Sequence, residues 1–230
     1  MKTIGLIGGM SWESSAEYYR LINQETKRRL DGQHNARSLM LTVDFAEVEH
    51  LQHAGEWSPL GAILADAARQ LERGGADFVV LCTNTMHKLA DSITGAVGIP
   101  LLHIVDAVGL AVQHSGQRRV GLLGTRFTME QPFYSARLKE KFGIETVIPS
   151  PADRTVVHRV IYDELCHGVT RGESRGAFQE IIAGLRDAGA EAVILGCTEI
   201  GLLVSQGDSA LPVHDSTKLH ALAAVEFALT

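Results

Sequence analysis

The sequence has few cysteines, few aromatic residues, and no long apolar or basic run. Three cysteines in 230 residues, without any CxxC spacing, exclude a disulfide framework and a zinc knuckle. No stretch reaches the about 18 apolar residues that a membrane-spanning helix needs. The formal net charge is -6, and no basic run or basic-aromatic patch occurs, which argues against a nucleic-acid partner. We therefore expect a cytoplasmic protein without a membrane or nucleic-acid partner.

Short apolar, β-branched runs alternate along the chain with segments of helical periodicity. The expected strands cover residues 4–7, 39–43, 78–81, 101–104, 120–123, 146–148 and 192–195. They lack the polar alternation of a half-exposed sheet, which is typical of strands covered on both faces. The expected helices cover residues 14–30, 59–73, 128–142, 152–167 and 173–188. This alternation predicts an α/β fold with a mostly parallel sheet flanked by helices.

The second half of the chain repeats features of the first half. GADFVVLCTNT (75–85) matches GAEAVILGCTE (189–199) at an offset of 114, and IGLIGGM (4–10) matches VGLLGTR (120–126) at an offset of 116. The second match aligns Tyr18 with Tyr134. The shortest matches have a plainer explanation, because all βα units resemble one another. The longer match predicts two similar, pseudo-symmetric α/β lobes at residues 1–116 and 117–230, and the last helix of the first lobe can cross over to the other.

The repeat assigns different positions to the neighbouring residues Cys82 and Thr83. Cys197 aligns with Thr83, whereas Cys82 aligns with Gly196. Because successive strand residues point to opposite faces, Cys82 and Thr83 cannot both face one site. Ligands bind at the carboxyl ends of strands in open α/β sheets. We therefore expect Thr83 and Cys197 on opposite walls of an interlobe cleft, and Cys82 as a packed core thiol.

Several motifs, weak alone, occur together in a specific order. They are GGMSWESS (8–15) with Tyr18, Tyr19, Ile22 and Asn23, TNTMH (83–87), LLGT (122–125) with Thr128, IYDEL (161–165) and GCTEI (196–200). In this order and spacing the sequence resembles the aspartate/glutamate racemase superfamily, and its aspartate-racemase branch best. The resemblance covers nearly the whole chain. The resemblance implies an isomerase that racemises aspartate, glutamate or related amino acids. It also implies that the enzyme is a homodimer and needs no cofactor such as pyridoxal phosphate (PLP).

The resemblance also assigns catalytic roles to two residues. The superfamily uses two cysteines, but the first-lobe cysteine is replaced here by Thr83. A thiol pKa is lowered by a helix N-terminus or by hydrogen bonds, and Cys197 stands where a helix should begin, with Thr198 as a nearby donor. A threonine hydroxyl is too weak an acid to ionise similarly. We therefore expect Cys197 to be the base for the L-enantiomer and Thr83 to be the opposing proton donor or relay.

Without an imine cofactor, the protein itself must stabilise the carbanionic carboxylate, and preorganised donors are the usual means. The resemblance implies donors for the substrate carboxylate at Met10, Asn84, Thr85 and Thr198. Further substrate-binding candidates are Gln52, Thr125, Thr128 and Glu199. The Gly8-Gly9 turn before a helix suits an anion, or it is simply a tight turn. We expect Glu199 either to anchor a helix N-terminus or to meet a substrate ammonium.

The sequence also allows other interpretations of the function. Some superfamily decarboxylases need only one cysteine, so a decarboxylase or a hydantoin racemase is an alternative, as is a non-catalytic amino-acid-binding protein. His50 and His53, next to Glu47 and Glu49, have a spacing that can bind zinc, but no cysteine or third histidine accompanies them, so we expect no metal. His87 either orients the loop or is structural. We expect Cys166 to serve packing.

Overall fold

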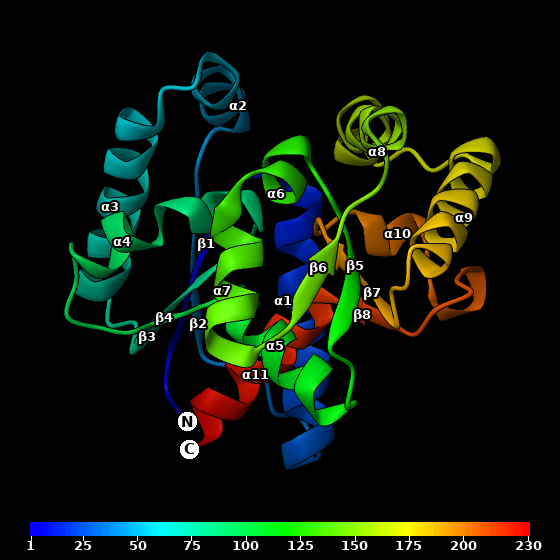
Figure 1. Cartoon of the computed structure of the whole chain (residues 1–230). Coiled ribbons are helices and arrows are strands. Elements are labelled where there is room, and N and C mark those ends of the chain that lie inside the picture. The colour runs from blue at the N-terminus through cyan, green and yellow to red at the C-terminus, as the bar shows by residue number, and fades with distance from the viewer. The chain divides into compact units, whose positions relative to one another are not determined.

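The computed structural model describes residues 1–230 and contains two four-stranded parallel sheets (Figure 1). One compact unit comprises Met1–His103 and His220–Thr230, and the other comprises Ile104–Leu219. The strand orders are β2-β1-β3-β4 and β6-β5-β7-β8, so both sheets have the same topology. The strands are β1 (Ile4–Gly8), β2 (Ser38–Thr42), β3 (Phe78–Leu81), β4 (Leu101–Leu102), β5 (Arg119–Gly124), β6 (Glu145–Val147), β7 (Ala192–Gly196) and β8 (Val213–Asp215).

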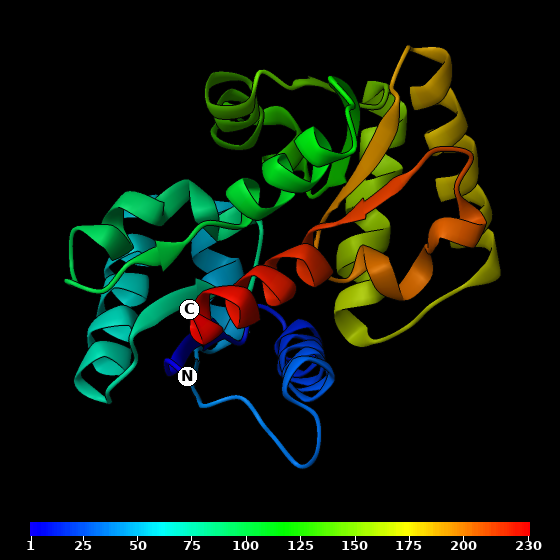
Figure 2. The same cartoon turned by 90° about the horizontal axis from the view of Figure 1, so that it is seen from below.

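Helices cover both faces of the first sheet. Val79 and Leu81 pack against α3 (Trp57–Arg73), whereas Phe78, Val80 and Cys82 pack against α1 (Trp12–Leu30) and the end of α11 (Ser216–Leu229). The two chain termini lie near each other in this unit (Figure 2), and the Lys2 N–H donates to the Ala228 carbonyl at 2.8 Å. The unit also contains α2 (Phe45–Ala54), the 3₁₀ helix η1 (Thr85–Leu89) and α4 (Ala90–Thr94).

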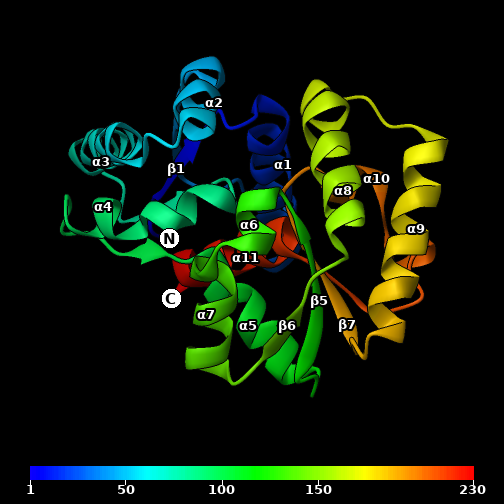
Figure 3. The same cartoon turned by 45° about the horizontal axis from the view of Figure 1, so that its top comes forward.

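The second sheet is covered in the same way (Figure 3). Val193 and Leu195 share a cluster with α8 (Pro151–Asp163) and α9 (Gly172–Asp187), and this cluster also contains Cys197. Ala192 and Ile194 pack on the other face against α5 (Ile104–His114) and α7 (Pro132–Phe142). The remaining elements of this unit are α6 (Arg126–Glu130), η2 (Leu165–His167), α10 (Ile200–Leu203) and η3 (Gln206–Asp208).

The structure confirms the expected fold class of two similar lobes, each with a parallel sheet flanked by helices. The single helix expected over residues 128–142 is wrong: α6 ends at Glu130 and Pro132 starts α7, since proline is favoured at the first position of a helix. The compact units divide after His103 and after Leu219, whereas the internal repeat places its boundary between residues 116 and 117. No helix combines the length and apolar composition that crossing a bilayer requires.

Candidate active site

The candidate residues divide equally between the two units, and all are buried. In the first unit Met10 follows β1, Thr83, Asn84 and Thr85 follow β3, and Gln52 lies in α2. In the second unit Thr125 and Thr128 follow β5, and Cys197, Thr198 and Glu199 follow β7. All candidates except Gln52 therefore come after the two central strands of their sheet, at the carboxyl ends where ligands bind in α/β proteins.

A carboxylate organises the residues that follow β7. The Cys197 thiol donates a hydrogen bond to Glu199 Oε2 at 3.0 Å, and the Thr198 hydroxyl donates to the same oxygen at 2.7 Å. Glu199 is 2% exposed and Cys197 is 7% exposed. In this arrangement the nearest hydrogen-bond acceptor for the thiol proton is a carboxylate oxygen.

The structure corrects the expected electrostatics of Cys197. Burial raises the pKa of the Cys197 thiol well above its usual value, and the negative charge of Glu199 raises this pKa further. Thr198 does not stabilise the thiolate, because its hydroxyl donates to Glu199. The helix that follows, α10, has only four residues, and its N-cap is Glu199. The resting thiol is therefore protonated at neutral pH.

Hydroxyl groups at the start of α11 bind the end of β7, and they lie outside the sequence motifs described above. The Ser216 hydroxyl donates to the Leu195 carbonyl at 2.6 Å, and the Thr217 hydroxyl donates to the Thr198 carbonyl at 3.5 Å. Both residues are buried. Ser14 plays the same part in the first unit, where its hydroxyl donates to the Cys82 carbonyl at 3.1 Å. The only available signal was the position of these hydroxyls at helix starts.

The turn after β3 is tied together by His87. His87 Nδ1 lies 2.7 Å from the Thr83 carbonyl oxygen, so this nitrogen carries the proton and donates. The backbone N–H of His87 also donates to the Asn84 carbonyl, at 3.1 Å. The Thr83 hydroxyl makes no hydrogen bond to another protein group, and Thr83 is 7% exposed. His87 therefore orients this loop while the Thr83 hydroxyl stays available to a ligand.

Two further histidines lie close to the His87 ring, and one of them contacts a tyrosine. The His87 ring is 4.5 Å from the His103 ring and 5.8 Å from the His220 ring, measured between centroids. His220 Nε2 donates to the Leu102 carbonyl at 2.8 Å, so its Nδ1 accepts the hydrogen bond of the Tyr18 hydroxyl at 2.8 Å. For a neutral ring, these two contacts fit the Nε2–H tautomer.

The glycine turn between β1 and α1 is tightly packed. Gly9 has a φ of 95°, and a Cβ at this position would lie 2.2 Å from the Val43 carbonyl oxygen, so only glycine fits. The Gly9 N–H donates to the Ser15 hydroxyl at 2.8 Å, and the Ser14 N–H donates to the Ser11 hydroxyl at 3.3 Å. Two of the backbone donors expected to meet an anion are therefore already occupied.

Thr125 and Thr128 lie side by side at the end of β5. Thr125 is the N-cap of α6: its hydroxyl oxygen accepts the Thr128 N–H at 3.3 Å. The two hydroxyl oxygens are also 3.3 Å apart. These contacts fix both side chains at the carboxyl end of the strand.

The remaining sequence candidates take no part in these arrangements. Cys82 is a fully buried core thiol, as expected, and burial raises its pKa. Arg126, next to Thr125, and His167, next to Cys166, are both exposed. His50 and His53 belong to no group of three side chains that could hold a metal ion.

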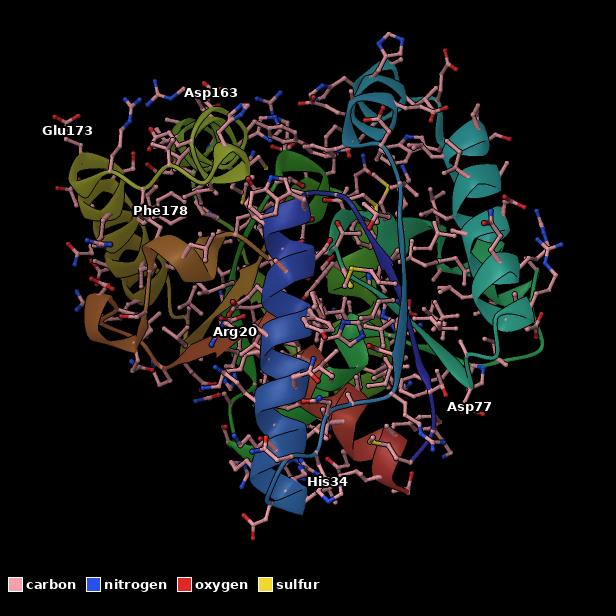
Figure 4. The ribbon with its side chains drawn as sticks, turned by 180° about the vertical axis from the view of Figure 1, so that it is seen from behind. Arg20, His34, Asp77, Asp163, Glu173 and Phe178 are labelled. Carbon is pink, nitrogen blue, oxygen red and sulfur yellow. The ribbon has the colours of Figure 1, made fainter.

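A surface hollow of about 370 Å³ between α8 and α9 contains none of the candidate residues. Asp163 and Glu173 at its rim point outward, whereas Phe178 lies inside the second unit (Figure 4).

Known proteins share this sequence pattern and this structure. The Asp/Glu/Hydantoin racemase family model matches residues 7–224. A crystal structure described as an Asp/Glu racemase from Yersinia pestis is 50% identical, with full coverage of both chains and a TM-score of 0.93. An aspartate racemase homologue from Pyrococcus horikoshii OT3 is 34% identical, again with full coverage of both chains and a TM-score of 0.85.

The broad specificity amino-acid racemase RacX of Bacillus subtilis (strain 168) is 28% identical over 159 residues. This match covers 67% of the present chain and 66% of RacX, just under two thirds of that relative. The names of these proteins agree with the expected enzyme class, an isomerase of the amino-acid racemase type. Because the model of the Asp/Glu/Hydantoin racemase family matches nearly all of the sequence, the chain belongs to this family.

Proposed function

We propose that the protein is a PLP-independent racemase of aspartate, glutamate or related amino acids, acting by proton transfer at the α-carbon. One observation carries the proposal: Cys197 and Thr83 follow the matched central strands β7 and β3 at an offset of 114 residues. Val79 and Leu81 precede Thr83 on the sheet face that packs on α3, and Val193 and Leu195 precede Cys197 on the matched face. The internal repeat therefore extends to the packing around the two side chains.

Cys197 removes the α-proton of the L-enantiomer with the help of Glu199. The thiol is protonated in the resting protein, so it must first lose a proton to act as a base. Glu199 Oε2, 3.0 Å from the sulfur, takes this proton. The thiolate then takes the proton from the α-carbon, which leaves a carbanion, a neutral thiol and a protonated Glu199. Glu199 afterwards releases its proton to solvent.

Thr83 delivers a proton to the opposite face of the α-carbon. Its hydroxyl has no competing hydrogen bond, and the loop around it is fixed by His87. After donation the alkoxide recovers a proton from water. Because an alcohol is a far weaker acid than a thiol, Thr83 is a poor initial base, and turnover favours the L-enantiomer as substrate.

Hydrogen-bond donors of the chain stabilise the carbanionic carboxylate. We assign this role to Asn84, Thr85 and Thr198 and to the loop at Met10, with Thr125 and Thr128 as additional donors. Gln52, which is 3% exposed, is the polar group assigned to the substrate side chain. Some aspartate racemases carry an arginine after the second strand and a lysine near the IYDEL motif, which can bind the side-chain carboxylate of the substrate. The corresponding segments 44–53 and 165–168 of this chain contain neither residue. Their absence is consistent with a substrate range that is not limited to acidic amino acids.

The proposal also includes the oligomeric state and the subcellular location of the protein. The family resemblance supports a homodimer in the cytoplasm, which analytical ultracentrifugation and cell fractionation can test.

An enantiomer-resolved assay tests the proposed reaction. Each enantiomer of aspartate, glutamate and a panel of other amino acids is incubated with the protein without added cofactor, and the products are separated by chiral chromatography. The proposal expects D-product from at least one L-amino acid, at a rate that Cys82→Ala leaves within about twofold. Turnover of the D-enantiomers alone, or of none, would contradict it.

A decarboxylase is the second candidate, because only one of the two proposed catalytic residues is a cysteine. Thr83 replaces a thiol that a two-cysteine racemase needs, whereas Cys197 alone could protonate a carbanion formed by loss of carbon dioxide. Release of carbon dioxide from substituted malonates, with no racemisation of amino acids, would select this function.

A further inference from the structure

Cys166 lies in the same packing cluster as the proposed base. It is half-buried in η2 and packs against the cluster that contains Cys197, Ile200 and Leu203. The short helix α10, which follows Cys197, contacts η2 directly. The third cysteine, Cys82, belongs to the core of the other unit. The fold therefore brings a second thiol to the neighbourhood of Cys197 from a distant part of the sequence.

The two thiols differ in exposure and share an electrostatic environment. Cys197 is 7% exposed, whereas Cys166 is half-buried and the more accessible of the pair. A charge on Cys166 contributes to the raised pKa of the Cys197 thiol, after burial and Glu199, which means that each sulfur lies within the electrostatic range of the other. Peroxide attack at this pair is therefore expected at Cys166 first, because peroxide reaches the more accessible sulfur more readily.

The backbone around Cys166 is suited to a small local movement. Three residues form η2, and its hydrogen bonds run from the His167 N–H to the Glu164 carbonyl and from the Gly168 N–H to the Leu165 carbonyl, each 3.0 Å long. Gly168 then closes the turn at a φ of 68°. Such a short 3₁₀ segment can shift at a lower cost than a strand or a long helix. A disulfide needs Cα atoms about 4.4 to 6.8 Å apart, so a movable partner favours bond formation.

We propose that Cys166 and Cys197 are a reversible oxidation site that closes to a disulfide in the presence of hydrogen peroxide. Cys166 loses its proton to solvent and its sulfur attacks one peroxide oxygen. The O–O bond breaks, and the departing hydroxide takes up a proton to become water, which leaves a sulfenic acid on Cys166. Cys197 loses its proton to Glu199 and attacks the Cys166 sulfur. The hydroxyl group leaves as water with that proton. Together the two thiols supply two electrons, and one peroxide becomes two waters.

The disulfide blocks the proposed reaction because it consumes the base. This consequence rests on the proposed function, whereas formation of the bond does not. A thiol reductant restores both cysteines, so the site acts as a reversible switch.

Peptide mapping after peroxide treatment tests the bond directly. The reduced full-length protein is treated with hydrogen peroxide, remaining thiols are blocked with iodoacetamide under denaturing conditions, and unreduced peptides are identified by mass spectrometry. We expect a linked peptide pair containing Cys166 and Cys197, and a loss of about tenfold or more in L-enantiomer turnover that dithiothreitol reverses. If the protein has no racemase activity, the linked peptides still decide whether the bond forms.

Two variants serve as tests of the pair. Cys166→Ser keeps the size of the side chain, so we expect untreated turnover within about twofold of wild type, no linked peptide, and no dithiothreitol-reversible loss of activity. Cys82→Ala should behave as the wild type does in every assay. A wild-type protein without the linked pair, or a Cys166→Ser protein that still loses activity reversibly, would overturn the proposal.

Discussion

The Cys197 sulfur lies 3.0 Å from Glu199 Oε2 and donates its proton to that carboxylate. This contact makes the thiol harder to ionise, and it also gives the thiol proton a defined acceptor. The same carboxylate thus disfavours the free thiolate, and in the proposed mechanism it also takes the proton when the thiolate forms. These two effects can be separated by replacing the carboxylate with an amide.

Replacing Glu199 with glutamine should move two properties in opposite directions. Loss of the negative charge lowers the Cys197 pKa, so alkylation by iodoacetamide at pH 7.5 should rise about tenfold. Loss of the proton acceptor should slow α-proton exchange from the L-enantiomer about 100-fold, a typical effect of removing a general base. Stopped-flow alkylation across pH and chiral chromatography measure the two. Glu180→Gln, on the exposed face of α9, is the control and should change neither. An increase in both rates would show that Glu199 merely suppresses the thiolate.

A second thiol at position 83 should remove the preference for the L-enantiomer. Thr83→Cys supplies a group that ionises far more readily than a hydroxyl, so turnover of the D-enantiomer should rise by about tenfold or more. Thr83→Ser is the matched control and should keep the wild-type asymmetry. Initial rates from both enantiomers decide the question. An asymmetry that survives in Thr83→Cys would show that Thr83 is not the opposing proton donor.

The paired tyrosines of the internal repeat should respond oppositely to loss of their hydroxyls. Tyr18 and Tyr134 are both fully buried, but only the Tyr18 hydroxyl has a partner, His220 Nδ1. Tyr18→Phe should lower the free energy of unfolding by about 1 to 3 kcal/mol, because a buried acceptor loses its donor. Tyr134→Phe should raise it by up to about 1 kcal/mol, because an unpaired buried hydroxyl is removed. Urea unfolding of both variants measures these changes, and equal destabilisation would contradict the assignment.

The Glu25 carboxylate should contribute to stability in a defined pH range. Hydrogen bonds from Arg28 and Arg29 lower its pKa to about 2 against the opposing effect of burial. Because the folded-state pKa lies below the ordinary value, the contribution is complete above about pH 4.5 and is lost as the pH falls toward 2. Allowing for screening of the exposed Arg28, Glu25→Gln should cost about 1 to 2 kcal/mol at pH 7. The cost should vanish near pH 2 in urea titrations, and a cost independent of pH would refute this origin.

The periodicity of the sequence predicted most of the strands but fewer of the helices. The run at Phe78–Leu81 is uniformly apolar because both faces of β3 are covered, and it was assigned correctly. Helix α11 was missed because apolar residues occur on all its sides, which leaves no helical period to detect. The strand β8 was missed because His214 and Asp215 make its sequence polar, so it lacks the apolar run that marked the other strands.

At the candidate site, the sequence indicated the residue types but not the hydrogen bonds among them. The GCTE motif identified Cys197, Thr198 and Glu199, but whether Thr198 donates to the thiol or to the carboxylate depends on side-chain rotamers. Likewise, the contact between η2 and α10 joins segments more than 30 residues apart, and no local pattern encodes it.

The most direct test follows the α-proton itself. L-aspartate and L-glutamate are incubated in D₂O with wild-type protein, Cys197→Ala or Cys82→Ala, and loss of the α-proton signal is followed by NMR. We predict exchange with the wild type and with Cys82→Ala, and a loss of about 1,000-fold or more with Cys197→Ala, because the thiolate that removes the α-proton is lost. Exchange at the wild-type rate in Cys197→Ala would contradict the central role of this thiol.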